Sequence, residues 1–123
     1  MTEIRNTKQR QYDLETRVLE FAKACRKYVK TLKPSIISIE DGKQMVRSSG
    51  SVGANCLEAN EAISKKDFLH RLRIAKKEAR ETIYWLKLLE APEPLIKEAS
   101  ELMHILGAIL EKSKWALAFR PSN

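Results

Sequence analysis

A repeating pattern between positions 45 and 63 constrains the fold more than any other feature of this chain. Apolar and small residues recur there at alternating steps of four and three, which is the spacing of a buried helix face. The residues of this seam are Met45, Ser49, Val52, Cys56, Ala59 and Ile63. Two stripes of mostly small residues run beside it, Gly50, Ala54 and Leu57, and Ser48, Ser51 and Asn55. Gly and Ser disfavour helices, but small residues let neighbouring backbones come close. We therefore predict a central helix that packs on more than one face.

Three other segments carry the same helical periodicity. Their core stripes are Leu14, Val18, Phe21, Cys25, Val29 and Leu32, then Phe68, Leu72, Ala75, Ala79, Thr82, Leu86 and Leu89, then Leu95, Ala99, Leu102, Leu106 and Ile109. A second stripe, Met103, Leu110 and Leu117, widens the last apolar face. Asp13, Ser38 and Ser64 are candidate N-caps, and Pro34 and Pro92 mark breaks between helices.

The expected helices therefore run over about residues 12–33, 38–63, 65–90 and 94–118. Because the connections between them are short, neighbouring helices should be antiparallel. We predict an all-α fold, an up-down-up-down antiparallel four-helix bundle over residues 12–118. A loose basic arm over residues 1–11 and a tail over residues 119–123 would flank the bundle.

Length and composition favour a single cytoplasmic domain. The chain has 123 residues, enough for one hydrophobic core, and 32% of them are charged. Its apolar runs fall short of the roughly 18 residues of a membrane span, and its first residues lack the apolar region of a signal peptide. Cys25 and Cys56 lie on predicted core faces without metal-ligand spacing, so we expect buried, reduced thiols.

The net charge of +7 is distributed unevenly along the chain. Residues 1–37 hold nine basic and four acidic side chains, and residues 65–91 hold eight and four. The third expected helix concentrates its charge on one stripe, which lies opposite its core stripe. That stripe consists of Lys66, His70, Arg73, Lys77, Arg80, Tyr84 and Lys87. The first helix has a shorter basic set, Lys23, Lys27 and Lys30, with Arg26 beside it.

The basic stripe has two interpretations. It could bind the phosphate backbone of RNA or DNA, with Lys66, Arg73, Lys77 and Arg80 as the main cations and Tyr84 stacking on a base. It could instead be an ordinary solvated face, in which Lys77 and Glu81 pair along the helix. Because no recognition motif is present, any binding should not depend on nucleotide sequence.

The sequence contains little that would support a catalytic or metal-binding site. Glu101-Leu102-Met103-His104 matches half of a di-iron motif, but antiparallel pairing places His104 opposite Glu81 and far from His70. We therefore expect His104 and Glu81 to form a polar pair, and we expect no metal, cofactor or catalytic site. Neither cysteine has a histidine partner, and the glycines lie within helices, so no phosphate-binding loop is present.

Four polar residues remain on otherwise closely packed helices. These are Arg47, Asn55, Glu58 and Glu81. Buried polar groups need hydrogen-bond partners, so we interpret the four as a structural network that fixes helix register. A ligand site is the alternative.

The run RSSGSVGANCLEANEA over residues 47–62, followed by SKKDF over 64–68, resembles a known bacterial family. Its members are four-helix bundles first recognised as products of intervening sequences in 23S ribosomal RNA genes. The run IAKKEARETIYWL over residues 74–86 and the opening Tyr12-Asp13-Leu14 also match the family pattern. Many members continue Asn-x-x-Glu with Gly, whereas this chain has Ala59, which indicates a variant subgroup.

The resemblance implies a homopentamer, in which Arg47, Asn55, Glu58 and Glu81 occupy recurrent polar positions. A similar basic pentameric bundle, the accessory protein of diversity-generating retroelements, binds nucleic acid and a reverse transcriptase. Together with the basic stripe, this leads to our main hypothesis, a non-enzymatic homo-oligomer that binds RNA or DNA through its first and third helices. The alternative is a protein-interaction module without a nucleic-acid role.

Overall fold

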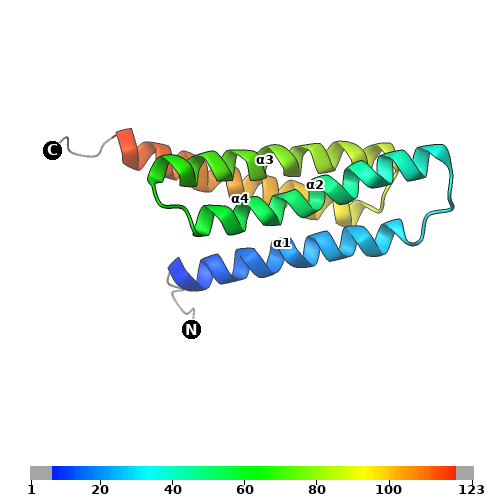
Figure 1. The fold of residues 1–123 in the computed structure, drawn as a ribbon, viewed down its shortest axis with the longest axis horizontal. Helices are drawn as coiled ribbons and strands as arrows, with labels where there is room; N and C mark the ends of the chain where they lie inside the picture. The colour runs from blue at the N-terminus through cyan, green and yellow to red at the C-terminus, as the bar shows by residue number, and fades with distance from the viewer. Residues whose placement is uncertain (1–6, 119–123) are drawn as a thin grey trace.

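The computed structural model describes residues 7–118, with side chains over 13–113. Four antiparallel helices make up this part of the chain, α1 (Thr7–Val29), α2 (Ile36–Asn60), α3 (Lys65–Leu88) and α4 (Glu93–Ala118) (Figure 1). The predicted all-α four-helix bundle is confirmed. Within residues 7–118, no helix is long and apolar enough to cross a membrane.

The helices are not packed equally tightly. The α2–α3 pair is the closest, α3–α4 and α1–α2 follow, and the α1–α4 seam is the loosest. The α1–α2 connection lies beyond the adjacent ends of α3 and α4, so this hairpin protrudes from one end of the bundle (Figure 1). The small-residue helix α2 packs against both α1 and α3, as its several stripes predicted.

The first two helices begin earlier than predicted. The α1 helix starts at Thr7, so Asp13 lies within it and is not its N-cap. Residues 7–12 are polar and aperiodic, but their Lys, Gln and Arg residues are good helix formers. The N-cap of α2 is Ser35, whose hydroxyl accepts a hydrogen bond from the Ser38 amide at 3.0 Å, while Ser38 completes the capping box. The remaining residues of the predicted arm, 1–6, and the tail, 119–123, lie outside the described residues.

The later boundaries lie closer to the prediction. The α2 helix ends at Asn60, so Ile63 falls outside it and is exposed, unlike the rest of its predicted seam. Ser64 caps α3 by accepting a hydrogen bond from the Asp67 amide at 3.1 Å. The turn into α4 uses Glu90 in the left-handed region, at φ 55°, with the Ala91 amide bonded to the Leu86 carbonyl at 2.9 Å.

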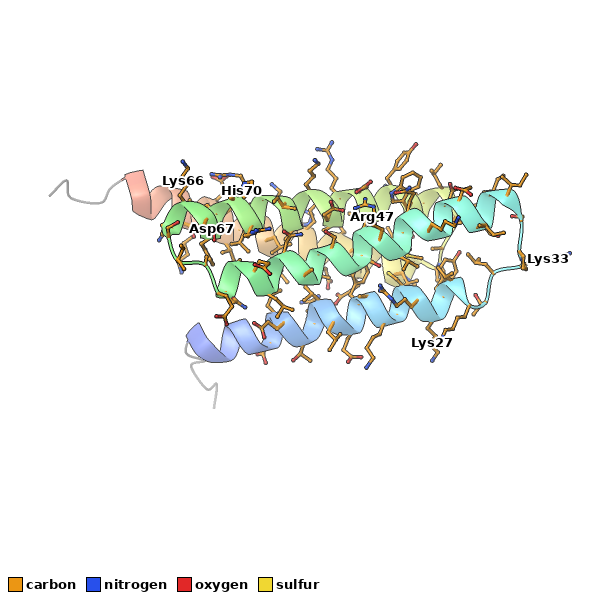
Figure 2. All side chains as sticks on the ribbon, in the orientation of Figure 1. Lys27, Lys33, Arg47, Lys66, Asp67 and His70 are labelled. Carbon is orange, nitrogen blue, oxygen red and sulfur yellow. The ribbon has the colours of Figure 1, made fainter. Side chains whose placement is uncertain are left out.

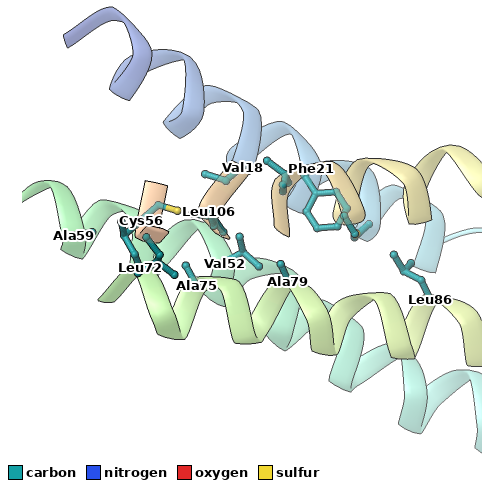
Figure 3. Packing of buried hydrophobic residues seen from close by; sticks show 14 of the residues in the cluster. Val18, Phe21, Val52, Cys56, Ala59, Leu72, Ala75, Ala79, Leu86 and Leu106 are labelled. Carbon is teal, nitrogen blue, oxygen red and sulfur yellow. The ribbon is translucent and has the colours of Figure 1, made fainter. Parts of the chain in front are cut away.

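The predicted stripes form the core (Figure 3). Fully or almost fully buried members include Val18, Phe21, Cys25, Met45, Val52, Cys56, Leu72, Ala75, Ala79, Leu86, Ala99, Leu102 and Leu106. Polar groups are buried between α2 and α3 as well, where the Thr82 and Ser48 hydroxyls lie 2.8 Å apart. Thr82 is also 2.8 Å from the Glu78 carbonyl, so its buried hydroxyl is satisfied.

Candidate nucleic-acid interface

The basic stripe of α3 is exposed along its whole length. All seven of its residues are exposed, and Lys66 and His70 project from the outer side of the bundle (Figure 2). Among the described residues, none of its five Lys and Arg members forms an ion pair; these are Lys66, Arg73, Lys77, Arg80 and Lys87. Their charges are therefore not compensated by a neighbouring carboxylate.

Two carboxylates of α3 that lie beside the stripe are paired with a residue of another helix. Arg47 of α2 donates from Nη1 to Glu78 at 3.2 Å and from Nη2 to Glu81 at 2.5 Å. Its Nε also donates to Gln44 at 3.3 Å. Glu81 is therefore paired with Arg47 across the interface between α2 and α3, and the alternative ion pair of Lys77 with Glu81 does not form.

The pKa values of Glu78 and Glu81 shift in opposite directions beside the shared Arg47 guanidinium. Glu78 is the more buried, so its pKa is raised by burial and by its proximity to Glu81. Burial is the largest single influence on Glu81 and acts to raise its pKa, but the hydrogen bonds from Arg47, Glu78 and Trp85 and the charge of Arg47 together outweigh burial, so the pKa is lowered. The pKa of Arg47 is raised, chiefly by its hydrogen bond with Glu81. At neutral pH, the cluster therefore holds a fixed cation between two carboxyl groups.

A hollow of about 680 Å³ adjoins this cluster on the surface. Its lining combines stripe residues with their neighbours on α3 and one residue of α2, namely Arg47, Lys77, Glu78, Arg80, Glu81, Tyr84 and Trp85. Tyr84 is 58% exposed and meets Trp85 edge-on, with ring centroids 5.2 Å apart and an interplanar angle of 71°. The indole Nε1 of Trp85 is buried, and its interaction with the Glu81 carboxylate contributes to lowering the pKa of Glu81.

The basic set of α1 lies elsewhere on the molecule. Lys23, Lys27 and Lys30 are exposed, but Lys23 is 3.6 Å from Glu20 and is partly neutralised. Lys27 projects on the opposite side of the bundle from Lys66 (Figure 2). The first and third helices therefore do not build one continuous basic surface on a protomer, and the α3 stripe is the stronger candidate.

The predicted four-residue polar network is divided in the structure. Arg47 and Glu81 come together, but Asn55 donates instead to the Ser51 carbonyl at 2.9 Å and hydroxyl at 3.1 Å. Glu58 is exposed. Sequence reasoning missed Glu78, although its place three residues before Glu81 puts both carboxylates within reach of the same neighbouring helix.

Helix contacts or burial account for His104, Glu101 and the two cysteines. His104 Nδ1 lies 2.7 Å from the Ser100 carbonyl, so the expected pair with Glu81 is wrong. Glu101 binds Arg17 of α1 at 2.5 Å. Across the described residues, no three His, Cys, Asp or Glu side chains are placed to hold a metal ion. Burial raises the pKa of both Cys25 and Cys56 to about 11.

Comparisons with known proteins identify relatives. The profile of a family described as 23S rRNA-intervening sequence protein matches residues 10–111. A crystal structure from Bacteroides thetaiotaomicron, of a protein of unknown function from the S23 ribosomal protein family, is similar with a TM-score of 0.73 and 34% identity. The similarity covers 82% of this chain and 97% of that one. Among curated proteins, none matches significantly.

Proposed function

Since this chain belongs to the family of 23S rRNA-intervening sequence proteins, we propose that it is a nucleic-acid-binding accessory protein. It binds RNA or DNA without sequence specificity, acts in the cytoplasm as a homo-oligomer, and catalyses no reaction. The observation that carries this proposal is the α3 stripe, in which five exposed Lys and Arg side chains share one helix face and form no ion pair with the side chains described over residues 13–113.

The geometry of the stripe suits a phosphate backbone. From Lys66 to Lys87 the helix rises by about 32 Å, since each residue adds ~1.5 Å. Cations spread over that length can meet a succession of phosphates and release their counterions, which gives affinity without reading base edges. An exposed stripe already paired with acids would gain much less from the same contact.

A groove between α1 and α2 supports self-association. It has a volume of about 340 Å³, and the small residues Gly50, Gly53 and Ala54 form part of its lining. Leu19 and Leu57 line it too, although they are 56% and 52% exposed. Burying them against another protomer would remove apolar surface from water. The α3 stripe lies outside this groove and would stay accessible in such an oligomer, for which the family resemblance implies five subunits.

The test is binding to a labelled RNA and a DNA duplex across a salt series, with two matched triple variants. Arg73→Gln/Lys77→Gln/Arg80→Gln removes three charges from α3, and Lys23→Gln/Lys27→Gln/Lys30→Gln removes three from α1. We expect the α3 variant to lose affinity and to lower the steepness of log K against log salt by about two to three units. The α1 variant should change both quantities less.

Two results would count against the proposal. Equal effects of the two variants would show that net charge matters and the α3 stripe does not. Failure of the unmodified protein to bind either nucleic acid at low salt would leave the stripe as a solvated face. Mass measured in the same buffer tests the oligomer, and a monomer would contradict that part of the proposal.

The second candidate, a protein-interaction module, is favoured by the protruding α1–α2 hairpin. Ile36 and Ile37 at the start of α2 are 84% and 68% exposed, which is unusual for bulky apolar residues so close together. A protein partner, such as the reverse transcriptase that the resemblance implies, could cover them. Tight association with a protein partner by a chain that binds no polyanion would favour this candidate over the first.

A further inference from the structure

We infer that the hollow beside the α3 stripe accepts an unpaired nucleobase, so that the protein prefers single-stranded nucleic acid to a duplex. This inference rests on the proposed function and specifies the form of nucleic acid that the stripe binds. It is drawn from the position of Tyr84, from the hollow that Tyr84 lines and from the polar cluster of Arg47, Glu78 and Glu81.

The hollow lies where a base would project from a bound backbone. Lys77, Arg80 and Tyr84 belong both to the stripe and to the lining of the hollow. A strand whose phosphates follow the stripe therefore passes the mouth of the hollow within one helical turn. The hollow is open to solvent, so a base could enter it from a strand that lies along the helix.

Tyr84 offers a stacking platform at that position. Its ring is more than half exposed, and Trp85 contacts it edge-on, an arrangement that supports the ring without covering both of its faces. Stacking on an aromatic side chain requires a base whose own face is free. In a duplex the neighbouring base pairs cover those faces, so the platform discriminates against double strands.

The polar groups of the hollow suit the edge of a base. Trp85 Nε1 is buried beside Glu81 and helps to hold that carboxylate in its charged form, so it positions the acceptor and does not itself contact a ligand. The carboxylate of Glu81 can accept from an amino group, and Arg47 fixes its position. Watson–Crick pairing occupies these edges in a duplex, so only an unpaired base can use them.

The charge of the hollow is compatible with a nucleic-acid strand. Three cations, Arg47, Lys77 and Arg80, face two carboxyl groups, Glu78 and Glu81. The guanidinium of Arg47 lies between those two carboxyl groups and neutralises much of their field. The glutamates therefore do not repel the phosphates that the stripe attracts.

The experiment compares a labelled 20-nucleotide single strand with the same strand annealed to its complement. Both are titrated against the full-length protein and three variants, Tyr84→Ala, Tyr84→Phe and Leu88→Ala. Leu88 is also an exposed bulky residue of α3 and serves as the matched control, since it has no aromatic ring and does not line the hollow. Helical circular dichroism confirms that each variant is folded.

We expect the single strand to bind at least tenfold more tightly than the duplex. Tyr84→Ala should weaken single-strand binding by about 5- to 150-fold, the range that stacking supplies, and leave duplex binding unchanged. Tyr84→Phe and Leu88→Ala should bind like the unmodified protein. Trp85 emission should change when the single strand binds, measured in a Trp115→Phe background where Trp85 is the remaining tryptophan.

The outcomes separate this inference from the proposed function. Equal affinity for single strand and duplex, or no effect of Tyr84→Ala, would overturn the unpaired-base site while salt-dependent binding by the stripe still stood. Absence of binding to both probes at low salt would overturn the proposed function and the inference together.

Discussion

Two glycines of α2 should respond in opposite ways to alanine, although both lie within the same helix. A Cβ atom added at Gly50 would meet Nη2 of Arg26 at 3.2 Å, which is the far end of a flexible, exposed side chain. Arg26 can move aside, giving up at most the 3.2 Å hydrogen bond from its Nη1 to the Ala22 carbonyl. Because Ala is favoured over Gly in a helix by about 1 kcal/mol, Gly50→Ala should stabilise the protein by about 0.5–1 kcal/mol.

Gly53 has a stiffer neighbour. Its added Cβ would lie 3.3 Å from Cγ2 and 3.6 Å from Cβ of Val18. Val18 is 2% exposed and β-branched, so its side chain has few other rotamers. Overpacking of this kind costs about 1–3 kcal/mol and offsets the gain in helix propensity. We expect Gly53→Ala to destabilise the protein by about 0–2 kcal/mol, so the two variants should differ by about 0.5–3 kcal/mol.

Urea unfolding measures this difference as a shift in the midpoint at constant slope. With a slope of about 2 kcal/mol per molar, the two midpoints should lie about 0.3–1.5 M apart. Because both glycines line the α1–α2 groove, the measurement is repeated at two protein concentrations to separate folding from association. A Gly53→Ala midpoint that rises as much as that of Gly50→Ala would refute the packing argument.

Three further predictions concern single contacts. Thr82→Val, a nearly isosteric change that removes a buried hydroxyl, should lower the free energy of unfolding by about 1–2 kcal/mol. Hydrogen bonds from Arg17 lower the pKa of Glu98 below its usual 4.5. The contact between Arg17 and ionised Glu98 therefore stabilises the fold fully above pH 4.5, and this contribution is lost as the pH falls through the folded-state pKa of Glu98. In urea titrations between about pH 5 and 3, the free energy of unfolding should therefore fall less with pH for Arg17→Met than for the unmodified protein. Cys25 and Cys56, buried and with pKa values of about 11, should react at least tenfold more slowly with a disulfide reagent at pH 8 than after unfolding in urea.

The arrangement of helices was predictable because their core stripes are long and regular. The seam of Met45, Ser49, Val52, Cys56 and Ala59 is buried as expected. Helix boundaries were harder, since residues outside the core carry no periodic signal. Ser38 was predicted as the N-cap of α2, but Ser35, three residues earlier, takes that position and Ser38 closes the capping box.

Ion pairs between side chains of different helices depend on how far one helix is shifted along the other, to within one turn. Sequence patterns do not determine that shift. The Arg47 contacts with Glu78 and Glu81 and the Arg17 contact with Glu98 are of this kind. The placement of Lys27 and Lys66 on opposite sides follows from which helices are diagonal in the bundle, and composition carries no information about that (Figure 2). The exposure of the α3 stripe, in contrast, followed from its position opposite the core stripe.

Lysine footprinting of the complex tests the central claim most directly. The unmodified protein is acetylated at a limiting reagent concentration with and without a saturating 20-nucleotide single-stranded RNA at low salt, and modification is quantified for each lysine. We predict protection of Lys66, Lys77 and Lys87 on α3, with Lys27 and Lys30 on α1 modified at nearly unchanged rates. Unchanged modification of the three α3 lysines at saturation would contradict the assignment of this helix as the binding surface.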